Sequence, residues 1–311
     1  MKTGPTAHIL SPTLGEAARE AACESGRLLK GRAGACEADQ SAPLYNRSLL
    51  PESQRERIEV VLVSPRNPLN IGAVARAMAN FGFARLSVVS PYEPHWREAR
   101  SAVGAPDLLR DARETTSLAE AVRNCTLVLG TGTLTHRKPE QPVVRLDELA
   151  PLVVQNLDSG GRIAVVFGPE KHGLTREDLS LCKALVEIPT DPRQPSMNLG
   201  QAAAVCLYVL ATRLSTGGNP RTAEDLVNSS AGTKRPAGSV EPTPTSGDLD
   251  ILAGLIEQVM VAAKYSPNMM QEANRQDLRL ILRRLNLSAP DGRRALGLFR
   301  RILRRIRSSQ T

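Results

Sequence analysis

Aromatic side chains and clusters of metal-binding residues are scarce in this chain of 311 residues. Phe, Trp and Tyr make up only 3% of it, which argues against RNA-binding domains that stack bases on rows of aromatic side chains. The four histidines are scattered without ligand spacing, so we expect no metal site. The five cysteines are widely spaced without a CxxC pair, which favours neither a disulfide framework nor a zinc site: Cys23, Cys36, Cys125, Cys182 and Cys206.

The sequence also lacks targeting and membrane signals. No apolar run approaches the ~18 residues that a membrane-spanning helix needs. The N-terminus has no hydrophobic signal core, and Glu16, Glu20 and Glu24 argue against a transit peptide. We therefore expect a cytoplasmic protein without membrane contact.

The sequence contains no GxSxG motif, which forms the nucleophile turn of many serine hydrolases.

Positive charge is what the sequence has in excess. Lys and Arg number 40 against 32 Asp and Glu, which gives a formal net charge of +8 and a pI near 9.6. Such a surplus favours a polyanionic partner, because neutralising phosphates releases their counterions. A soluble protein that merely carries a basic tail is the alternative interpretation.

Composition divides the chain into four segments. Residues 1–56 are rich in Ala, Gly, Ser and charge, and we expect a mostly disordered extension. Residues 57–214 have the pattern of a folded domain. Residues 215–247 contain few large apolar side chains and predict a flexible linker. Residues 248–311 predict a basic module of three amphipathic helices, which is so small that we expect it to pack on the main domain or on a partner chain.

Short apolar runs alternate with helical patterns inside the folded domain. Strands are predicted at 58–63, 86–89, 126–129, 163–167 and 184–188. Helices are predicted at 72–81, 117–124, 175–182 and 199–214. This alternation is typical of an α/β fold with a parallel sheet.

In the second helix of the basic module, the predicted apolar face consists of Leu278, Ile281, Leu282 and Leu285.

Three polar motifs lie where strands should end and helices begin. They read NIGAVAR at 70–76, FGPEKHGLT at 167–175 and SMNLGQA at 196–202. Open α/β sheets bind their ligands at such positions. In this order the motifs resemble motifs 1, 2 and 3 of the SpoU/TrmH family of SPOUT RNA 2′-O-ribose methyltransferases. The resemblance implies a C-terminal trefoil knot that shapes a pocket for S-adenosylmethionine, and a homodimer whose contacts are the helices at 72–81 and 199–214.

The resemblance also implies roles for individual residues. Arg76 would serve the ribose hydroxyl, Asn70 would support the loop or the arginine, and Glu170 would organise the site near Arg76. Ser196 and Asn198 would lie near the reacting ribose. The methyl donor would be bound by two loops and by backbone groups of the third motif, at Thr131, Gly132, Thr133, Gly168, Ile188, Ser196, Met197, Asn198 and Leu199.

Each role has a simpler structural alternative. Arg76 could be a helix residue in a structural ion pair, and Asn70, Ser196 and Asn198 are all common helix N-caps. A guanidinium is also a poor base, so we expect a substrate phosphate beside Arg76 to help orient it and to accept the hydroxyl proton.

The lead-in VSPRNPLN at 63–70 and the arginine-rich C-terminal helices resemble one subgroup of the family. Its members methylate cytidine or uridine at position 32 of the tRNA anticodon loop, which makes tRNA the expected partner. The alternatives are an rRNA 2′-O-methyltransferase of the same family and a non-catalytic RNA-binding protein on the same scaffold.

Overall fold

The computed structural model describes residues 51–132, 139–215, 242–265 and 270–309. Most of the predicted N-terminal extension and linker, together with Thr133, therefore lies outside the described residues. The elements follow one another in this order: α2 (Glu52–Arg55), β1 (Ile58–Val63), α3 (Pro68–Phe81), β2 (Arg85–Val89), η2 (Trp96–Glu98), α4 (Pro106–Arg110), β3 (Arg113–Thr115), α5 (Leu118–Ala121), β4 (Leu127–Thr131), β5 (Val143–Arg145), η3 (Leu146–Glu148), α6 (Ala150–Asp158), β6 (Ile163–Phe167), α7 (Arg176–Ser180), β7 (Ala184–Glu187), α8 (Leu199–Ser215), α10 (Ser246–Ala262), α11 (Gln271–Arg284) and α12 (Ala289–Ser308).

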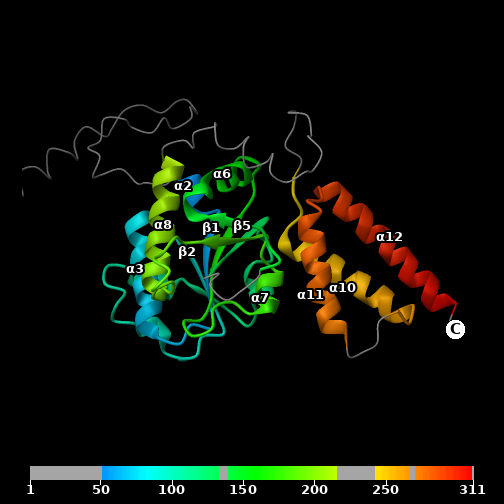
Figure 1. Ribbon diagram of the computed structural model, residues 1–311, viewed down its shortest axis with the longest axis horizontal. Helices are drawn as coiled ribbons and strands as arrows, with labels where there is room; N and C mark the ends of the chain where they lie inside the picture. The colour runs from blue at the N-terminus through cyan, green and yellow to red at the C-terminus, as the bar shows by residue number, and fades with distance from the viewer. Residues whose placement is uncertain (1–50, 133–138, 216–241, 266–269, 310–311) are drawn as a thin grey trace, which may run out of the picture. The chain divides into compact units, whose positions relative to one another are not determined.

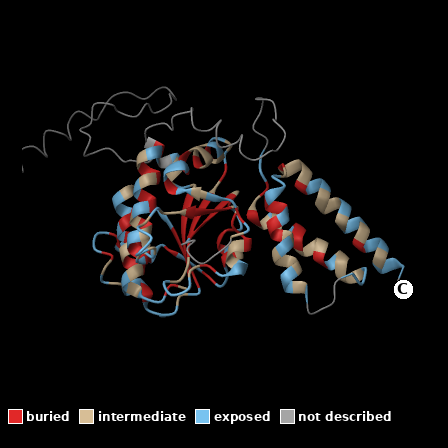
Figure 2. Cartoon of the chain, viewed as in Figure 1, coloured by how far each residue is buried: buried red, intermediate tan, exposed pale blue. Residues whose placement is uncertain are grey.

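The strands form one seven-stranded sheet in the order β3-β2-β1-β6-β4-β7-β5, and each neighbouring pair is parallel. In the centre, Ile58 of β1 is in register with Ile163 of β6. Both strands are buried along their whole length, as expected for a parallel sheet with helices on both faces (Figures 1 and 2). The predicted parallel α/β fold is confirmed.

Alternate side chains of β1 fill two hydrophobic cores, one on each face of the sheet. Val60 and Leu62 belong to the core that includes α3 and α8. Val61 and Val63 belong to the opposite core, with Leu118 of α5. Burying each Val or Leu stabilises the fold by about 1.5–3 kcal/mol. This period of two keeps the sheet in one register, so the ends of its strands have fixed positions.

The predicted elements of the domain are present, with shifted ends. Helix α3 begins at Pro68, four residues before the predicted start, because the Asn67 side chain accepts a hydrogen bond from the Leu69 N–H and acts as the N-cap. The short strands β3 and β5 and the helix α6 were not predicted. The turn of helix at α2 lies in the segment that was expected to be disordered.

Helices α10, α11 and α12 pack together in the segment for which a C-terminal module is predicted. Its small core joins Leu252 and Ala253 of α10 to Leu282 of α11, with Phe299 of α12 packed against them. Helix α10 begins at Ser246, before the expected boundary, because Thr245 and Asp248 form a capping box. Part of the predicted apolar face of α11 was wrong: two of its residues, Ile281 and Leu285, are exposed.

The module contacts the sheet domain through hydrogen bonds. The Arg283 side chain is buried and donates through Nε to the Leu181 carbonyl at 3.0 Å. The Ser246 N–H donates to the Cys125 carbonyl at 2.7 Å. These contacts agree with the expectation that the module packs on the main domain. Within the part of the chain described, no helix is both long and apolar enough to cross a lipid bilayer.

Candidate functional site

The order of the strands brings the predicted site segments to one edge of the sheet. Strands β1, β6, β4 and β7 are consecutive neighbours and all run parallel, so their carboxyl ends share that edge. The first motif follows β1, the second follows β6, and the third follows β7 after a loop. Gly132 follows β4. Segments that are far apart in the sequence are therefore neighbours in space.

Asn70 joins the three motifs by hydrogen bonds. Its Nδ2 donates to Oε1 of Glu170 at 2.9 Å, and its Oδ1 accepts from Nδ2 of Asn198 at 3.0 Å. The carboxylate can only accept, so it fixes which way the Asn70 amide faces. Asn70 lies within the first turn of α3, whose cap is Asn67. The structure thus contradicts the capping alternative for Asn70.

Glu170 holds the loop that leads into α3. Its carboxylate accepts from the N–H of Arg66 at 3.1 Å and from the N–H of Asn67 at 3.2 Å, besides Asn70. Partial burial raises the pKa of Glu170, but the hydrogen bonds together outweigh burial and leave this pKa below its ordinary value. Glu170 is therefore ionised at neutral pH. No contact between Glu170 and Arg76 is present among the described residues.

Asn198 has two functions at the start of α8. Its Oδ1 accepts from the Gly200 N–H at 2.9 Å, as an N-cap does, while its Nδ2 bonds Asn70. The capping alternative therefore holds for Asn198 together with its membership of the site. Gly200 lies against α3, since a side chain there would come within 2.8 Å of Ala73 Cβ. This close approach sets the spacing of the two motifs.

Arg76 is exposed on α3, away from this network. It lies six residues after Asn70, which on an α-helix is a rotation of about 240° and a rise of about 9 Å. Within the described residues its guanidinium forms neither an ion pair nor a hydrogen bond. The alternative of a structural ion pair thus finds no support, and the guanidinium is available to a ligand.

Two of the predicted donor-binding residues, Thr131 and Gly168, also stabilise the structure of the domain itself. Thr131 is buried, and its hydroxyl donates to the Val166 carbonyl at 3.0 Å, so this hydroxyl ties β4 to β6. A Cβ on Gly168 would lie 2.4 Å from the Leu174 N atom. Gly168 therefore makes room for the chain's own turn at Gly173, which has a φ of +62°. This close approach is a structural reason for a glycine at 168, and the expected place of Gly168 in the donor pocket stays a prediction.

The other donor-binding candidates line the edge of the sheet. Within the described residues, which leave out 133–138, a Cβ on Gly132 would meet no atom within 4 Å. Ile188 and Met197 are half-buried, Ser196 is exposed, and Leu199 is buried at the start of α8. Half-buried apolar side chains beside an open glycine suit a flat, partly apolar ligand such as an adenosine. The described residues contain no cluster of three or more His, Cys, Asp or Glu side chains that could hold a metal ion.

Sequence reasoning did not single out Arg66 and Asn67, whose N–H groups bind Glu170. The Asn67-Pro68 pair was a readable signal for the true start of α3, because Pro is favoured directly after an N-cap. Asn70 bonds Glu170, which is 100 positions away, and Asn198, which is 128 positions away. Contacts across such separations cannot be predicted from the local sequence.

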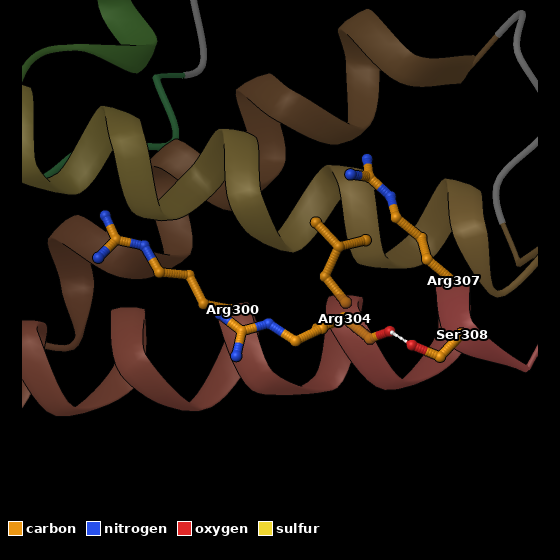
Figure 3. Close-up of a pocket in the computed structure, with 5 residues that line it drawn as sticks. Arg300, Arg304, Arg307 and Ser308 are labelled. Atoms are coloured by element: carbon orange, nitrogen blue, oxygen red, sulfur yellow. Dashed lines mark hydrogen bonds between the residues drawn. The ribbon is translucent and has the colours of Figure 1, made fainter.

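A second polar surface lies on the C-terminal module. A shallow groove on α12 is lined by Leu303, by Ser308 and by three arginines one turn apart, Arg300, Arg304 and Arg307. Figure 3 shows Arg307 directed toward α10 while the other two arginines extend along α12. Such spacing suits a row of phosphates rather than a single small molecule.

Comparison with known proteins identifies the family. The SpoU rRNA Methylase family matches residues 57–208. TrmJ of Pseudomonas aeruginosa, a tRNA (cytidine/uridine/adenosine-2′-O-)-methyltransferase, is 40% identical over 177 residues, which is 56% of this chain and 68% of the relative. TrmJ of Cronobacter sakazakii is 30% identical over 257 residues, 82% of this chain and 98% of the relative.

A solved structure extends the likeness beyond the length of the sheet domain. The crystal structure of TrmJ from Z. mobilis ZM4 aligns with a TM-score of 0.64 at 26% identity, and the alignment covers 78% of this chain and 98% of that chain. An alignment of that extent must include more than the sheet domain. Sequence and structure agree that the chain belongs to the SpoU methylase family, among relatives of the TrmJ type.

Proposed function

We propose that the chain transfers a methyl group from S-adenosylmethionine to a ribose 2′-hydroxyl of RNA, at cytidine or uridine 32 of the tRNA anticodon loop. The observation that carries this proposal is the hydrogen-bonded union of Glu170, Asn70 and Asn198, which joins the three family motifs at one edge of the sheet. The TrmJ relatives support the choice of tRNA, because their names describe tRNA 2′-O-methyltransferases.

The donor would lie at the ends of β6, β4 and β7, where it supplies an electrophilic methyl group. Backbone groups of Ile188, Met197 and Leu199 would hold it, and Gly132 leaves space beside them. Ser196, which is exposed, would face the ribose. We further propose that the segment after β7 passes through a loop of the domain and forms the trefoil knot of the family.

Arg76 would act on the acceptor side. A guanidinium has five N–H donors and no acceptor, so Arg76 would orient the 2′-oxygen and bind a neighbouring substrate phosphate. A phosphate oxygen of the RNA would accept the hydroxyl proton as the 2′-oxygen takes the methyl group. The S–CH3 bond of the donor would break with its electron pair left on sulfur, so that neutral S-adenosylhomocysteine leaves. Arg76 points away from Asn70 on the same helix, which favours a homodimer in which Arg76 serves the donor site of the partner.

The dimer would join the exposed faces of α3 and α8, which lie side by side (Figure 1). Val205 and Tyr208 on α8 are 36% and 53% exposed although they are apolar. The arginines of α12 would hold the folded tRNA by its phosphates. Such an enzyme would work in the cytoplasm, and its chemistry as proposed calls for no metal.

Mapping of ribose methylation in total RNA, with and without the gene, tests the substrate. We expect loss of the signal at position 32 of tRNA, and its return with the wild-type gene but not with Arg76→Ala. Binding of S-adenosylmethionine by purified Arg76→Ala should match that of the wild type, and Arg85→Ala is the control for removal of an exposed arginine. Loss of signal only in rRNA would replace tRNA by the rRNA alternative. Unchanged methylation in all RNA would favour the non-catalytic one.

A further inference from the structure

Two loops at the carboxyl end of the sheet bring an arginine and a tyrosine together. Arg66 follows β1 and Tyr92 follows β2. The Tyr92 N–H donates to the Pro65 carbonyl at 3.2 Å, which couples the loops. The guanidinium carbon of Arg66 lies over the Tyr92 ring, 5.4 Å from its centroid. The two side chains therefore form one stacked unit.

This unit presents an open aromatic face. Tyr92 is 69% exposed, in a chain with only four tyrosines. Arg66 covers one face of the ring, so the opposite face remains for a ligand. Within the described residues the Arg66 guanidinium has no ion pair or hydrogen bond, and so its charge is available as well. A flat π-face beside a cation suits a nucleobase next to its phosphate.

The unit has a fixed position beside the motif network. The N–H of Arg66 donates to Oε2 of Glu170, whose other oxygen accepts from Asn70. A single carboxylate thus positions both the backbone of Arg66 and the side chain that links the three motifs. Strands β1 and β2 are direct neighbours, so Tyr92 lies one strand further along the same edge. A ligand on Tyr92 would flank whatever binds at the motifs.

We infer that Tyr92, backed by Arg66, is a stacking surface for an unpaired nucleobase of the RNA loop that carries the target ribose. This inference rests on the proposed function. Proteins recognise RNA loops through bases that have left the stack, and such bases commonly stack on aromatic side chains. Stacking tolerates different bases because every base has a π-face, which agrees with an enzyme that accepts both cytidine and uridine.

The test uses the full-length protein and a synthetic anticodon stem-loop with 2-aminopurine beside the target nucleotide. Stacking on tyrosine quenches 2-aminopurine fluorescence, so binding and contact are read together. We expect Tyr92→Ala to weaken stem-loop affinity and raise KM about 5- to 150-fold, the range for loss of one stacked base. The quench should disappear. Tyr92→Phe, which keeps the ring, should retain both affinity and quench.

Controls separate this inference from the proposed function. S-adenosylmethionine affinity and the unfolding midpoint of Tyr92→Ala should equal those of the wild type. If Tyr92→Ala keeps wild-type affinity, KM and quench while the wild type methylates the stem-loop, the stacking surface is refuted and the function stands. If Tyr92→Phe fails as badly as Tyr92→Ala, the hydroxyl and not the ring is the contact, and the inference is refuted too. If the wild type methylates no RNA, the proposed function itself fails.

Discussion

The side-chain amide of Asn70 acts both as a hydrogen-bond donor and as an acceptor. It donates to the carboxylate of Glu170 and accepts from the amide of Asn198. A hydrogen bond to a charged group contributes about 1.5–3 kcal/mol, more than a neutral one, so the link to Glu170 is the stronger of the two. The residue is small, yet its loss would remove the side-chain hydrogen bonds that link the second and third motifs to the first.

Asn70→Asp should therefore disrupt the site although the side chain keeps its shape. The variant places a second carboxylate against Glu170 and removes the donor, so we expect methyl transfer to fall at least about tenfold and the unfolding midpoint to drop. Asn80→Asp, an exposed change on the same helix, is the matched control.

The pH dependence of this defect has a definite sign. In the wild type the pKa of Glu170 is lowered, so its stabilising contribution is present above the ordinary glutamate pKa and is lost as the pH falls through the lowered value. In Asn70→Asp the new carboxylate and that of Glu170 repel each other, so the pKa of one of them rises. Protonation of that group then relieves the repulsion. Thermal melts should show the difference between variant and wild type narrowing from pH 7 toward about pH 4.5. A difference that widens on acidification would contradict the assigned contact.

At the scale of elements, helices α3 and α8 depend on one close contact. A Cβ on Gly200 would lie 2.8 Å from Ala73 Cβ and would push the helices apart. We expect Gly200→Ala to lower the free energy of unfolding by about 1–3 kcal/mol and to weaken donor binding. Urea unfolding measures the first effect and calorimetry the second.

Gly297 in α12 provides the matched control. A Cβ there meets no atom of the described residues within 4 Å, so Gly297→Ala should stabilise the protein by about 0.5–1 kcal/mol through helix propensity alone. Equal effects of the two substitutions would show that the α3–α8 contact has more room than its geometry indicates.

Lys183 couples the sheet domain to helix α11. Its ammonium donates to the Arg283 carbonyl and to the side chain of Asn286. Burial, with a smaller effect of the Arg283 charge, lowers the pKa of Lys183 to about 8. The unfolded chain, with a lysine pKa near about 10.4, binds more protons between these two values. Stability should therefore rise with pH across this interval.

Lys183→Met should remove that rise. Unfolding free energies from pH 7.5 to 10.5 are compared for the wild type, for Lys183→Met and for Lys171→Met, which changes an exposed lysine. We expect the unfolding free energies of the wild type and of Lys171→Met to rise in parallel with pH. The unfolding free energy of Lys183→Met should depend less on pH than either. Parallel curves for all three proteins would refute the buried position of Lys183.

Sequence reasoning located elements better than it located contacts. Apolar runs such as 58–63 predicted β1, because a strand covered on both faces has no polar positions. Strands β3 and β5 have three residues each and read RET and VVR, which is too short for an alternating or apolar pattern to be recognised. They exist because the neighbouring strands β2 and β7 offer them partners.

In the candidate site, too, the residues could be predicted from the sequence but their contacts could not. The identities of Asn70, Glu170 and Asn198 could be read from the motifs. Their contacts could not, because these follow from strand order, and no local signal places β6 between β1 and β4. The prediction that Glu170 organises the site near Arg76 stays a prediction: within one chain Arg76 lies on another side of α3 from Asn70.

At the scale of the whole molecule, charge on α12 should govern RNA affinity. Replacing Arg300, Arg304 and Arg307 with Gln removes the charges that line the groove. We expect weaker tRNA binding and a salt dependence flatter by about 2 in log-log slope, because each lost phosphate contact lowers the slope by about 0.7–0.9. Donor binding should be unchanged, since the sheet domain is intact.

The control removes the same charge elsewhere. Arg97, Arg110 and Arg145 each face a carboxylate on the sheet domain, so their triple replacement with Gln should leave the salt slope nearly as it was. Affinity titrations at four salt concentrations compare the two triple variants. Equal slopes for both would remove α12 from the RNA interface.

The hydrogen bond from Asn198 to Asn70 spans 128 residues, and this separation has a consequence during synthesis. A ribosome adds about 5–20 residues per second, so Asn70 leaves the exit tunnel roughly 10 s before its partner exists. Throughout that interval the nascent chain holds Arg76 and the start of α3 without the motif that completes the site. On the proposed function, we expect a truncated translation product that ends before residue 198 to be inert toward RNA methylation, because it lacks the Asn198 bond to Asn70.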